Sequence, residues 1–299
     1  DLDSQLDVLL KRGIDNGAKI RMIDKNEFSK LVPDGRTASG RAIWSPNTNV
    51  VSPKLVISRL FRKLKENGIQ FILNTKILKV DKNKKSIIFG NNQFPKSKNF
   101  NIEYDFLFNT AGLQADKVAK NFQIGKEFFL LPFRGNYWKL NPDSGLNFNC
   151  NLYPVPDLNM PFLGVHVTPS TDGFTYLGPS AIPAFGSENY QGLEGFEIFK
   201  SINSFSIIIN QILKDEDGFR KYAQEQSTLA FKYFFFKSAK LLIPKLKISD
   251  LIPSQKVGIR PQLYSKKTKK LIKDFHIEFD GNHLHALNAI SPAFTASFA

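Results

Sequence analysis

The segment 283–297 holds the residues whose types and order most clearly indicate chemistry. An apolar strand runs through this segment into Ser291-Pro292 and then into small residues that suit the start of a helix. Serine caps a helix well, and proline is tolerated in its first turn. The free backbone amides of such a turn attract an electron-rich group, and small side chains let a ligand approach them closely. The segment therefore predicts a ligand site at a strand-to-helix turn.

The basic charge of the chain poses a choice between two classes of protein. The 299 residues carry a formal net charge of +14, with a pI near 9.6. Such a charge suits a protein that binds nucleic acid or an anionic membrane surface. The lysines are scattered, however, and the clusters at 82–85 and 266–270 lack the interleaved aromatic residues of a single-strand binding track. We therefore expect no nucleic-acid partner, whereas a peripheral membrane association stays open.

Cysteine usage and hydropathy favour a cytoplasmic protein. Cys150 is the single cysteine, which excludes an internal disulfide and a cysteine-based zinc site. No apolar run reaches the ~18 residues that a membrane span needs. We expect no metal, and we expect a cytoplasmic location, with peripheral attachment to the inner membrane as the alternative. Because the chain starts at Asp1 and stops at Ala299 inside the predicted helix, we also expect a piece of a longer enzyme.

Two kinds of sequence pattern alternate along the chain. Apolar spacing predicts a helix over 1–17 and another that begins at Pro53, followed by strand material over 69–81. Between residues 131–184 short aromatic segments alternate with Pro/Gly turns, which is typical of an antiparallel sheet. Residues 190–248 are mainly helical, with phenylalanines that we assign to the core, and strands follow them. Two domains, each assembled from non-contiguous segments, are the economical interpretation.

Six segments occur in the order in which one enzyme family has them. They read LPFRGNYWKL, NLYPVPDLNMPFLGVHVT, LGPSAIPAF, VGIRPQL, LIKDF and LHALNAISPAFTAS. Together they closely resemble the L-2-hydroxyglutarate oxidase/dehydrogenase family of the D-amino-acid-oxidase superfamily. The YPVPD…PFLGVH segment is the most distinctive, and VGIRPQ is similar to the Gly-x-Arg-Pro element of that superfamily.

The resemblance implies a FAD enzyme of mixed α/β and α+β class. It implies an incomplete Rossmann-like FAD-binding domain from 41–122 and 253–299, interleaved with a substrate domain from 1–40 and 123–252 on a mixed or antiparallel sheet. Such enzymes carry a Gly-x-Gly-x-x-Gly loop, which cradles the pyrophosphate, in an upstream βαβ unit. The chain has no such motif. We therefore expect a fragment that lacks this unit and the C-terminal helix, and that is itself inactive.

The implied reaction oxidises the C2 alcohol of L-2-hydroxyglutarate to 2-oxoglutarate, with a hydride passing to flavin N5. A general base must take the alcohol proton, and His166 is the first candidate because it lies in the most family-specific segment. His285 is the second. Because the substrate is a dianion, two cations are needed; Arg260 is the first choice as a clamp, by analogy with Gly-x-Arg-Pro relatives, and Arg134 is the second. Tyr153 is the candidate donor to a substrate oxygen.

Each of these assignments has a structural alternative. His166 suits a hydrogen-bonded position in a sheet, Arg260 an ion pair, and Arg134 the bracing of a loop. Tyr153 suits a core position on the face of a sheet. The resemblance further implies cofactor contacts from Gly112, Asn288, Ser291, Pro292, Ala293 and Thr295. We expect Arg260, His166 and the segment 288–295 to converge on one cleft.

Other functions stay open on the same residues. The chain could belong to another 2-hydroxy-acid or amino-acid oxidase of the superfamily, or it could be a non-catalytic basic fragment. The expected partners are a small dicarboxylate substrate and an electron acceptor, either quinone or another carrier.

Overall fold

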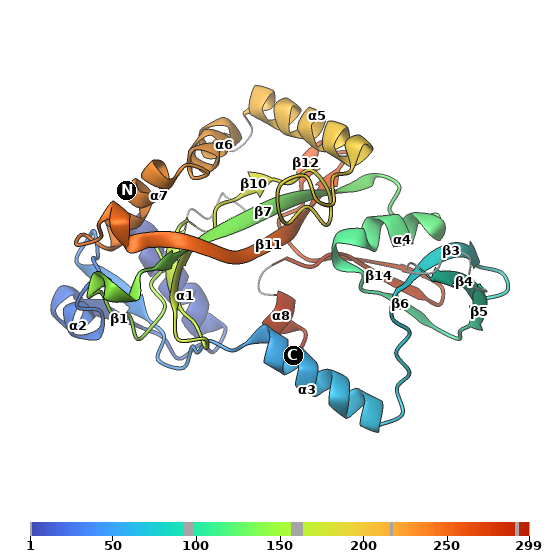
Figure 1. Ribbon diagram of the computed structural model, residues 1–299, viewed down its shortest axis with the longest axis horizontal. Helices are drawn as coiled ribbons and strands as arrows, with labels where there is room; N and C mark the ends of the chain where they lie inside the picture. The colour runs from blue at the N-terminus through green and yellow to red at the C-terminus, as the bar shows by residue number, and fades with distance from the viewer. Residues whose placement is uncertain (1, 92–98, 157–163, 216–217, 291–292, 299) are drawn as a thin grey trace. The chain divides into compact units, whose positions relative to one another are not determined.

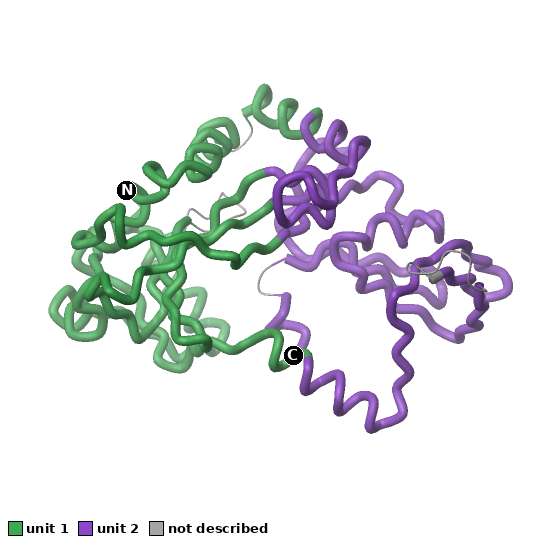
Figure 2. Tube along the Cα trace, in the orientation of Figure 1, with its two compact units in different colours: residues 1–57, 134–182, 206–258 green, residues 58–133, 183–205, 259–299 purple. Residues whose placement is uncertain are grey.

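The computed structural model describes residues 2–91, 99–156, 164–215, 218–290 and 293–298 (Figure 1). The chain divides into two compact units, and each is built from three separate stretches (Figure 2). Unit 1 comprises residues 1–57, 134–182 and 206–258, and unit 2 comprises residues 58–133, 183–205 and 259–299. Thus 41–57 belongs to unit 1 and 183–205 to unit 2, which differs from the boundaries expected for the two domains. The functional assignment of the domains stays a prediction.

The N-terminal part of unit 1 has local signals for each element. Its elements are α1 (Ser4–Asp15), β1 (Arg21–Asp24), α2 (Lys25–Leu31) and β2 (Arg41–Trp44), and α3 (Pro53–Glu66) begins in this unit. The carboxylate of Asp24 caps α2 by accepting a hydrogen bond from the Glu27 amide at 2.8 Å. β1 and β2 pair antiparallel, and Arg41 on β2 holds α1 through Asp3 and Asp7. The expected helices over 1–17 and from Pro53 are confirmed.

A large sheet follows, and its order along the hydrogen-bonded path is β12-β11-β7-β9-β8, with β10 paired to β7. The strands are β7 (Phe128–Leu140), β8 (His166–Pro169), β9 (Thr175–Gly178), β10 (Ile182–Pro183), β11 (Leu251–Ser265) and β12 (Lys270–Leu271). The pairs β7–β9 and β9–β8 are antiparallel, as expected from the aromatic segments and Pro/Gly turns of 131–184, and β11 and β12 also pair antiparallel. β7 is a single strand of 13 residues, longer than the short strands that the turns predicted.

The core of unit 1 lies on one face of this sheet. Val167, Leu177 and Trp138 from three neighbouring strands pack there with Phe235 and Ala239. The last two residues belong to α7; the helices of the 190–248 region are α5 (Ile198–Lys214), α6 (Phe219–Thr228) and α7 (Lys232–Leu242). Burial of large side chains on a helix face and a sheet face removes apolar area from water and stabilises both elements.

The phenylalanines of α7 and its N-cap divide between core and surface. Phe235 is buried in the core of unit 1, as expected. Phe231 and Phe234 keep 65% and 45% of their surface exposed, so the core assignment of the whole cluster was wrong. A helix presents only one face to a sheet, and neighbours of Phe235 point elsewhere.

Unit 2 contains two small sheets. The strands β3 (Thr75–Asp81), β4 (Ser86–Asn91) and β5 (Phe100–Glu103) form an antiparallel meander. The second sheet has the order β13-β14-β6, from β13 (His276–Asp280), β14 (His283–Asn288) and β6 (Leu107–Asn109). β14 and β6 are parallel, and the turn η1 (Gly112–Gln114) leads from β6 into α4 (Ala115–Asn121). This strand–turn–helix unit beside a parallel partner is the Rossmann-like part of the described chain.

The strand expected over 69–81 begins only at Thr75. Ile69, Phe71 and Leu73 precede it and keep 50%, 37% and 66% of their surface exposed. A strand needs a hydrogen-bonded neighbour as well as an alternating pattern. In the described part of the chain nothing pairs with this stretch, and so the pattern alone does not make a strand.

Two searches of the described residues bear on function. No helix among them is long and apolar enough to cross a membrane. No group of three or more histidine, cysteine, aspartate or glutamate side chains among them is arranged to hold a metal ion.

Candidate active site

The register of the large sheet sorts the side chains of unit 1 onto two faces. Residues directly opposite each other on antiparallel strands point to the same face, and neighbours along a strand alternate. His166 on β8 lies opposite Gly178 on β9, and Thr168 lies opposite Tyr176, which in turn lies opposite Lys139 on β7. These side chains therefore share the face away from the core, which we call the polar face.

The contacts that hold His166 on the polar face include those with Gly164 and Tyr153. The Nδ1 of His166 lies 3.0 Å from the carbonyl oxygen of Gly164. Because a carbonyl only accepts, Nδ1 carries the proton in the neutral ring, and Nε2 carries the lone pair. The ring of Tyr153 stacks on the imidazole, with centroids 4.3 Å apart and planes 24° apart. The histidine is 9% exposed, and its ring orientation is fixed by these partners.

Tyr153, which stacks on His166, is not part of β8. Burial raises the pKa of its hydroxyl, and a side-chain hydrogen bond with Thr168 works in the opposite direction. The residue follows Leu152, which bridges to Val167 on the core side of β8. Alternation then turns Tyr153 to the polar face, so that the structure brings the two predicted residues His166 and Tyr153 together.

A lysine that sequence reasoning missed lies on the same face. The ammonium of Lys256 on β11 lies 4.3 Å from the ring centroid of Tyr176 and 5.4 Å from that of Tyr137. Burial lowers the pKa of Lys256, and the charge of Asp172 raises it. The even spacing between Lys256 and Arg260, which puts strand residues on one face, was the available sequence signal.

The tyrosine beside this lysine is kept neutral. The Tyr176 hydroxyl donates to Asp172 Oδ2 at 2.7 Å. Burial, together with this bond and the nearby carboxylate charge, raises the pKa of Tyr176 to about 12. The carboxylate of Asp172 also accepts from the backbone amide of Phe174 at 3.1 Å. The carboxylate of Asp172 is thus hydrogen-bonded to two residues that follow it closely in the chain.

Arg134, the second predicted clamp, lies on β7 in unit 1. Its Nε is buried and has no hydrogen-bond partner. Within the described part of the chain its guanidinium is not paired with any carboxylate. The residue as a whole is only partly buried, and both interpretations, a substrate clamp and the bracing of a loop, stay predictions.

Arg260, the first predicted clamp, lies on β11 at the start of the last stretch of unit 2. Since His166 belongs to unit 1, the expected convergence of the two residues stays a prediction. The same holds for the expected cleft that also includes the segment 288–295.

The end of β6 in unit 2 has the features that a dinucleotide needs. Asn109 is buried, its amide donates to the Ala115 carbonyl at 2.9 Å, and its Oδ1 accepts from the Ala111 amide at 3.2 Å. These bonds hold the turn from strand to helix. Gly112 has a φ of +54°, and no atom lies within 4 Å of the position that a Cβ would take. The exposed backbone at the carboxyl end of a parallel strand fits a bound FAD. Asn109 was not predicted.

The remaining predicted cofactor residues lie at or beyond the end of β14. Asn288 is buried, donates to the carbonyls of Ile272 and Asp274 at 3.1 and 2.6 Å, and accepts from the Leu263 amide at 3.3 Å. Its side chain therefore organises the strand end. Ala293 and Thr295 lie in α8 (Ala293–Ala296), whereas Ser291 and Pro292 lie outside the described residues. The ligand site at this turn stays a prediction.

His285, the second candidate base, is fully buried in unit 2. Its Nδ1 accepts from the Asn109 amide at 3.0 Å, and its Nε2 has no partner. Burial lowers the pKa of the ring, and the neighbouring His283 lowers it further. These contacts favour a structural role at the end of β6.

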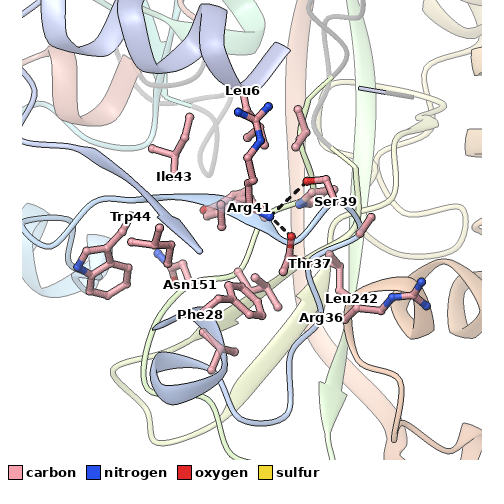
Figure 3. Close-up of a pocket in the computed structure, with 18 of the residues that line it drawn as sticks. Leu6, Phe28, Arg36, Thr37, Ser39, Arg41, Ile43, Trp44, Asn151 and Leu242 are labelled. Carbon is pink, nitrogen blue, oxygen red and sulfur yellow. Dashed lines mark hydrogen bonds between the residues drawn. The ribbon is translucent and has the colours of Figure 1, made fainter. Parts of the chain in front are cut away.

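A cavity of about 660 Å³ lies in unit 1 beside Tyr153 (Figure 3). Its volume suits a small molecule. Its polar contacts are internal: the Thr37 hydroxyl donates to the Arg41 carbonyl at 2.6 Å, and the Arg41 guanidinium pairs with Asp3 and Asp7. The rest of the wall is largely apolar, including Leu6, Phe28, Val32, Trp44, Leu152 and Leu242. Arg36 also lines the cavity, but the Arg41 charge is neutralised and most of the wall is apolar, so that the cavity suits a dianion less well than the polar face does.

Comparisons with known proteins agree with the resemblance seen in the sequence. The L-2-hydroxyglutarate dehydrogenase of Indibacter alkaliphilus is 35% identical over 98% of this chain and 71% of its own length. The human mitochondrial L-2-hydroxyglutarate dehydrogenase is 30% identical over 99% of the chain and 65% of its own length. That of Escherichia coli K12 is 28% identical over 97% and 66%. The chain thus spans about two thirds of the length of the curated relatives it matches.

Solved structures show the same fold. The FAD-bound, dithionite-reduced L-α-glycerophosphate oxidase of Mycoplasma pneumoniae superposes with a TM-score of 0.63 at 20% identity, covering 98% of this chain and 66% of its own. Glycine oxidase from Bacillus cereus gives a TM-score of 0.60 at 10% identity, over 98% and 66%. The sequence pattern of the FAD-dependent oxidoreductases matches residues 2–299. With both sequence and fold in agreement over nearly its whole length, the chain belongs to the FAD-dependent oxidoreductase family, among its L-2-hydroxyglutarate dehydrogenase members.

Proposed function

We propose that the protein oxidises the C2 alcohol of L-2-hydroxyglutarate to 2-oxoglutarate. The observation that carries this proposal is the match to the Indibacter alkaliphilus dehydrogenase, at 35% identity over 98% of the chain. The likeness to glycine oxidase concerns the fold alone, because the two sequences share only 10% identity. Bound FAD supplies the hydride acceptor of this chemistry.

His166 takes the alcohol proton in this proposal. Its Nδ1–H donates to the Gly164 carbonyl, so Nε2 is the nitrogen that accepts the proton. The stacked ring of Tyr153 holds the imidazole plane. A base needs this fixed orientation, because proton transfer requires hydrogen-bond reach at a defined angle.

Two cations bind the two carboxylates of the substrate in this proposal. Arg260 binds the carboxylate next to the reacting carbon, because a guanidinium matches a carboxylate with two parallel hydrogen bonds. Arg134 is the second predicted cation, and its unpaired, partly buried guanidinium supports that role. A monocarboxylate or an amino acid needs one clamp only, which is the chemical distinction from the alternative oxidases of the superfamily.

The surroundings of the reaction complete the proposal. We propose quinone or another carrier as the electron acceptor, and a cytoplasmic location, with peripheral attachment to the inner membrane as the alternative. Dispersed lysines rather than one basic face support an enzyme surface over a nucleic-acid-binding one.

Steady-state turnover with an artificial dye as acceptor tests the function. The complete, FAD-loaded enzyme is given L-2-hydroxyglutarate, D-2-hydroxyglutarate, glycine or glycerol 3-phosphate, and the keto product is identified. We expect the highest kcat/KM with L-2-hydroxyglutarate, with 2-oxoglutarate as the product. A higher kcat/KM for glycine or for glycerol 3-phosphate contradicts the proposal.

A further inference from the structure

The polar face carries a cation that neither the reaction nor the sequence motifs assign. Lys256 lies over the rings of Tyr137 and Tyr176, at 5.4 and 4.3 Å from their centroids. Ring faces attract an ammonium and hold it in place. A ring face does not accept a conventional hydrogen bond from the ammonium, whereas an oxygen atom does. In the described part of the chain, no oxygen accepts a hydrogen bond from Lys256 Nζ.

The nearest acid does not neutralise this lysine by direct contact. Asp172 is engaged by the Tyr176 hydroxyl at 2.7 Å and by the Phe174 amide at 3.1 Å. Its charge acts on Lys256 without a salt bridge between them. Lys256 is exposed, so its ammonium donors face solvent, and the two rings orient the ammonium so that an incoming anion can replace that water.

A glycine lies between the platform of this lysine and His166. Gly178 stands between Tyr137 and His166 on the polar face, since it lies opposite His166 on β8 and beside Tyr137 on β7. Its φ is +144°, and a Cβ there would come within 2.9 Å of the Tyr137 ring. The ring of Tyr137 therefore covers the glycine and forms a floor between the cation and the base.

The strand spacing puts the backbones of β7 and β8 within the reach of a five-carbon diacid. Two strand spacings, from β7 across β9 to β8, measure about 9.6 Å. In a fully extended 2-hydroxy diacid, the span from the alcohol oxygen to a far carboxylate oxygen, with a hydrogen bond of about 2.8 Å at each end, is at most about 12 Å. A substrate whose alcohol meets His166 can thus bring its far carboxylate to the ammonium above Tyr137 and Tyr176.

We propose that Lys256 is a third cation of the site, in addition to the predicted clamps Arg260 and Arg134, and that it binds the carboxylate of the substrate that lies farther from the reacting carbon, with Tyr137 and Tyr176 as its platform. The inference rests on the proposed function, because it uses the same substrate and the same base. It makes Lys256 the residue that distinguishes a dicarboxylate from a 2-hydroxy acid with an uncharged tail.

The test compares two substrates of equal length in the FAD-loaded enzyme: L-2-hydroxyglutarate and L-2-hydroxypentanoate, which lacks the far carboxylate. In Lys256→Met we expect kcat/KM for the diacid to fall about 10- to 100-fold, the range for a lost charged hydrogen bond. The value for L-2-hydroxypentanoate should change little. Lys256→Arg should restore part of the preference, because the charge is kept.

The matched control is Lys139→Met. Lys139 lies on the same face with its ammonium 3.9 Å from the ring centroid of Phe174, one row farther from His166. We expect Lys139→Met to prefer L-2-hydroxyglutarate over L-2-hydroxypentanoate as strongly as the wild-type enzyme does. Inhibition by glutarate, which has both carboxylates and no alcohol, gives a second reading without turnover, and its inhibition constant should rise only in the Lys256 variant.

Two results overturn the inference. An unchanged preference and unchanged glutarate inhibition in Lys256→Met show that the lysine does not bind the far carboxylate. Loss of the preference in Arg134→Met but not in Lys256→Met assigns that carboxylate to the arginine. Failure of the proposed function is a separate result, because wild-type enzyme would then show no preference for L-2-hydroxyglutarate in the first place.

Discussion

The imidazole of His166 stacks on the phenol ring of Tyr153, with ring centroids 4.3 Å apart and ring planes 24° apart. The Gly164 carbonyl fixes the same imidazole at Nδ1, 3.0 Å away. One contact sets the plane of the ring and the other sets the position of its proton. Together they orient Nε2 for taking a proton, which is what the proposed reaction requires.

Replacing this histidine should slow the chemical step and leave the cofactor in place. In His166→Ala we expect flavin reduction to slow about 100- to 10 000-fold, the usual range for a general base. FAD content should equal that of the wild type. Rapid mixing under anaerobic conditions measures the rate. The control is His276→Ala in unit 2, whose ring contacts Glu278 instead, and an equal slowing in both variants would remove His166 from the mechanism.

Arg134 should act on substrate capture. Its Nε is buried without a partner, so a bound carboxylate would supply the missing counter-charge. In Arg134→Met we expect KM for L-2-hydroxyglutarate to rise about 10- to 100-fold. The matched control is Arg36→Met, because that guanidinium is also unpaired within the described residues but lies at the cavity of Figure 3. A KM that is unaltered in Arg134→Met would favour the structural role.

Burial of His285 should make stability depend on pH. Its pKa in the folded protein is lowered from 6.5, first by burial and then by His283. The unfolded chain therefore takes up a proton at a higher pH than the folded one. The stability is complete above pH 6.5 and falls as the pH drops below that value toward the folded pKa, with a slope of at most about 1.4 kcal/mol per pH unit.

Urea unfolding at pH values on both sides of 6.5 measures this loss. In His285→Gln the dependence should flatten, because the glutamine does not titrate. In His276→Gln it should persist. A pH dependence that is the same in His285→Gln and in the wild type would show that another group is responsible.

Glu197 should contribute stability to unit 2 through its two donors. Burial alone would raise its pKa, but the ammonium of Lys117 and the amide of Ser187 outweigh burial and hold the pKa at about 2. Its contribution is present above pH 4.5 and is lost as the pH falls toward 2. Glu197→Gln should lower the free energy of unfolding at pH 7 by about 1 kcal/mol, because solvent screens part of the interaction. An unchanged midpoint in urea would contradict this.

Local signals in the sequence predicted much of the fold. Pro53 begins a helix because its fixed φ suits the first turn, and Asp24 caps α2. Partners distant in the sequence decided the rest. Residues 69–74 have a strand pattern but no neighbouring strand in the described chain. β7 continues past Gly135 because β11, β9 and β10 pair with it.

The candidate site was predictable only in part for the same reason. His166 and Tyr153 stand in one distinctive motif, and the structure stacks them. Lys256 stands in no motif, and its role follows from rings on two other strands. Asn288 is in a motif, yet its side chain is occupied by three backbone groups. Sequence spacing locates a residue on a strand but does not show what its side chain touches.

Anaerobic mixing of the FAD-loaded enzyme with L-2-hydroxyglutarate that carries deuterium at C2 tests the central claim most directly. The account predicts that the substrate bleaches the oxidised flavin, that the deuterated substrate does so more slowly, and that 2-oxoglutarate forms in equal amount. A flavin that stays oxidised with L-2-hydroxyglutarate, while glycine or glycerol 3-phosphate bleaches it, would contradict the account.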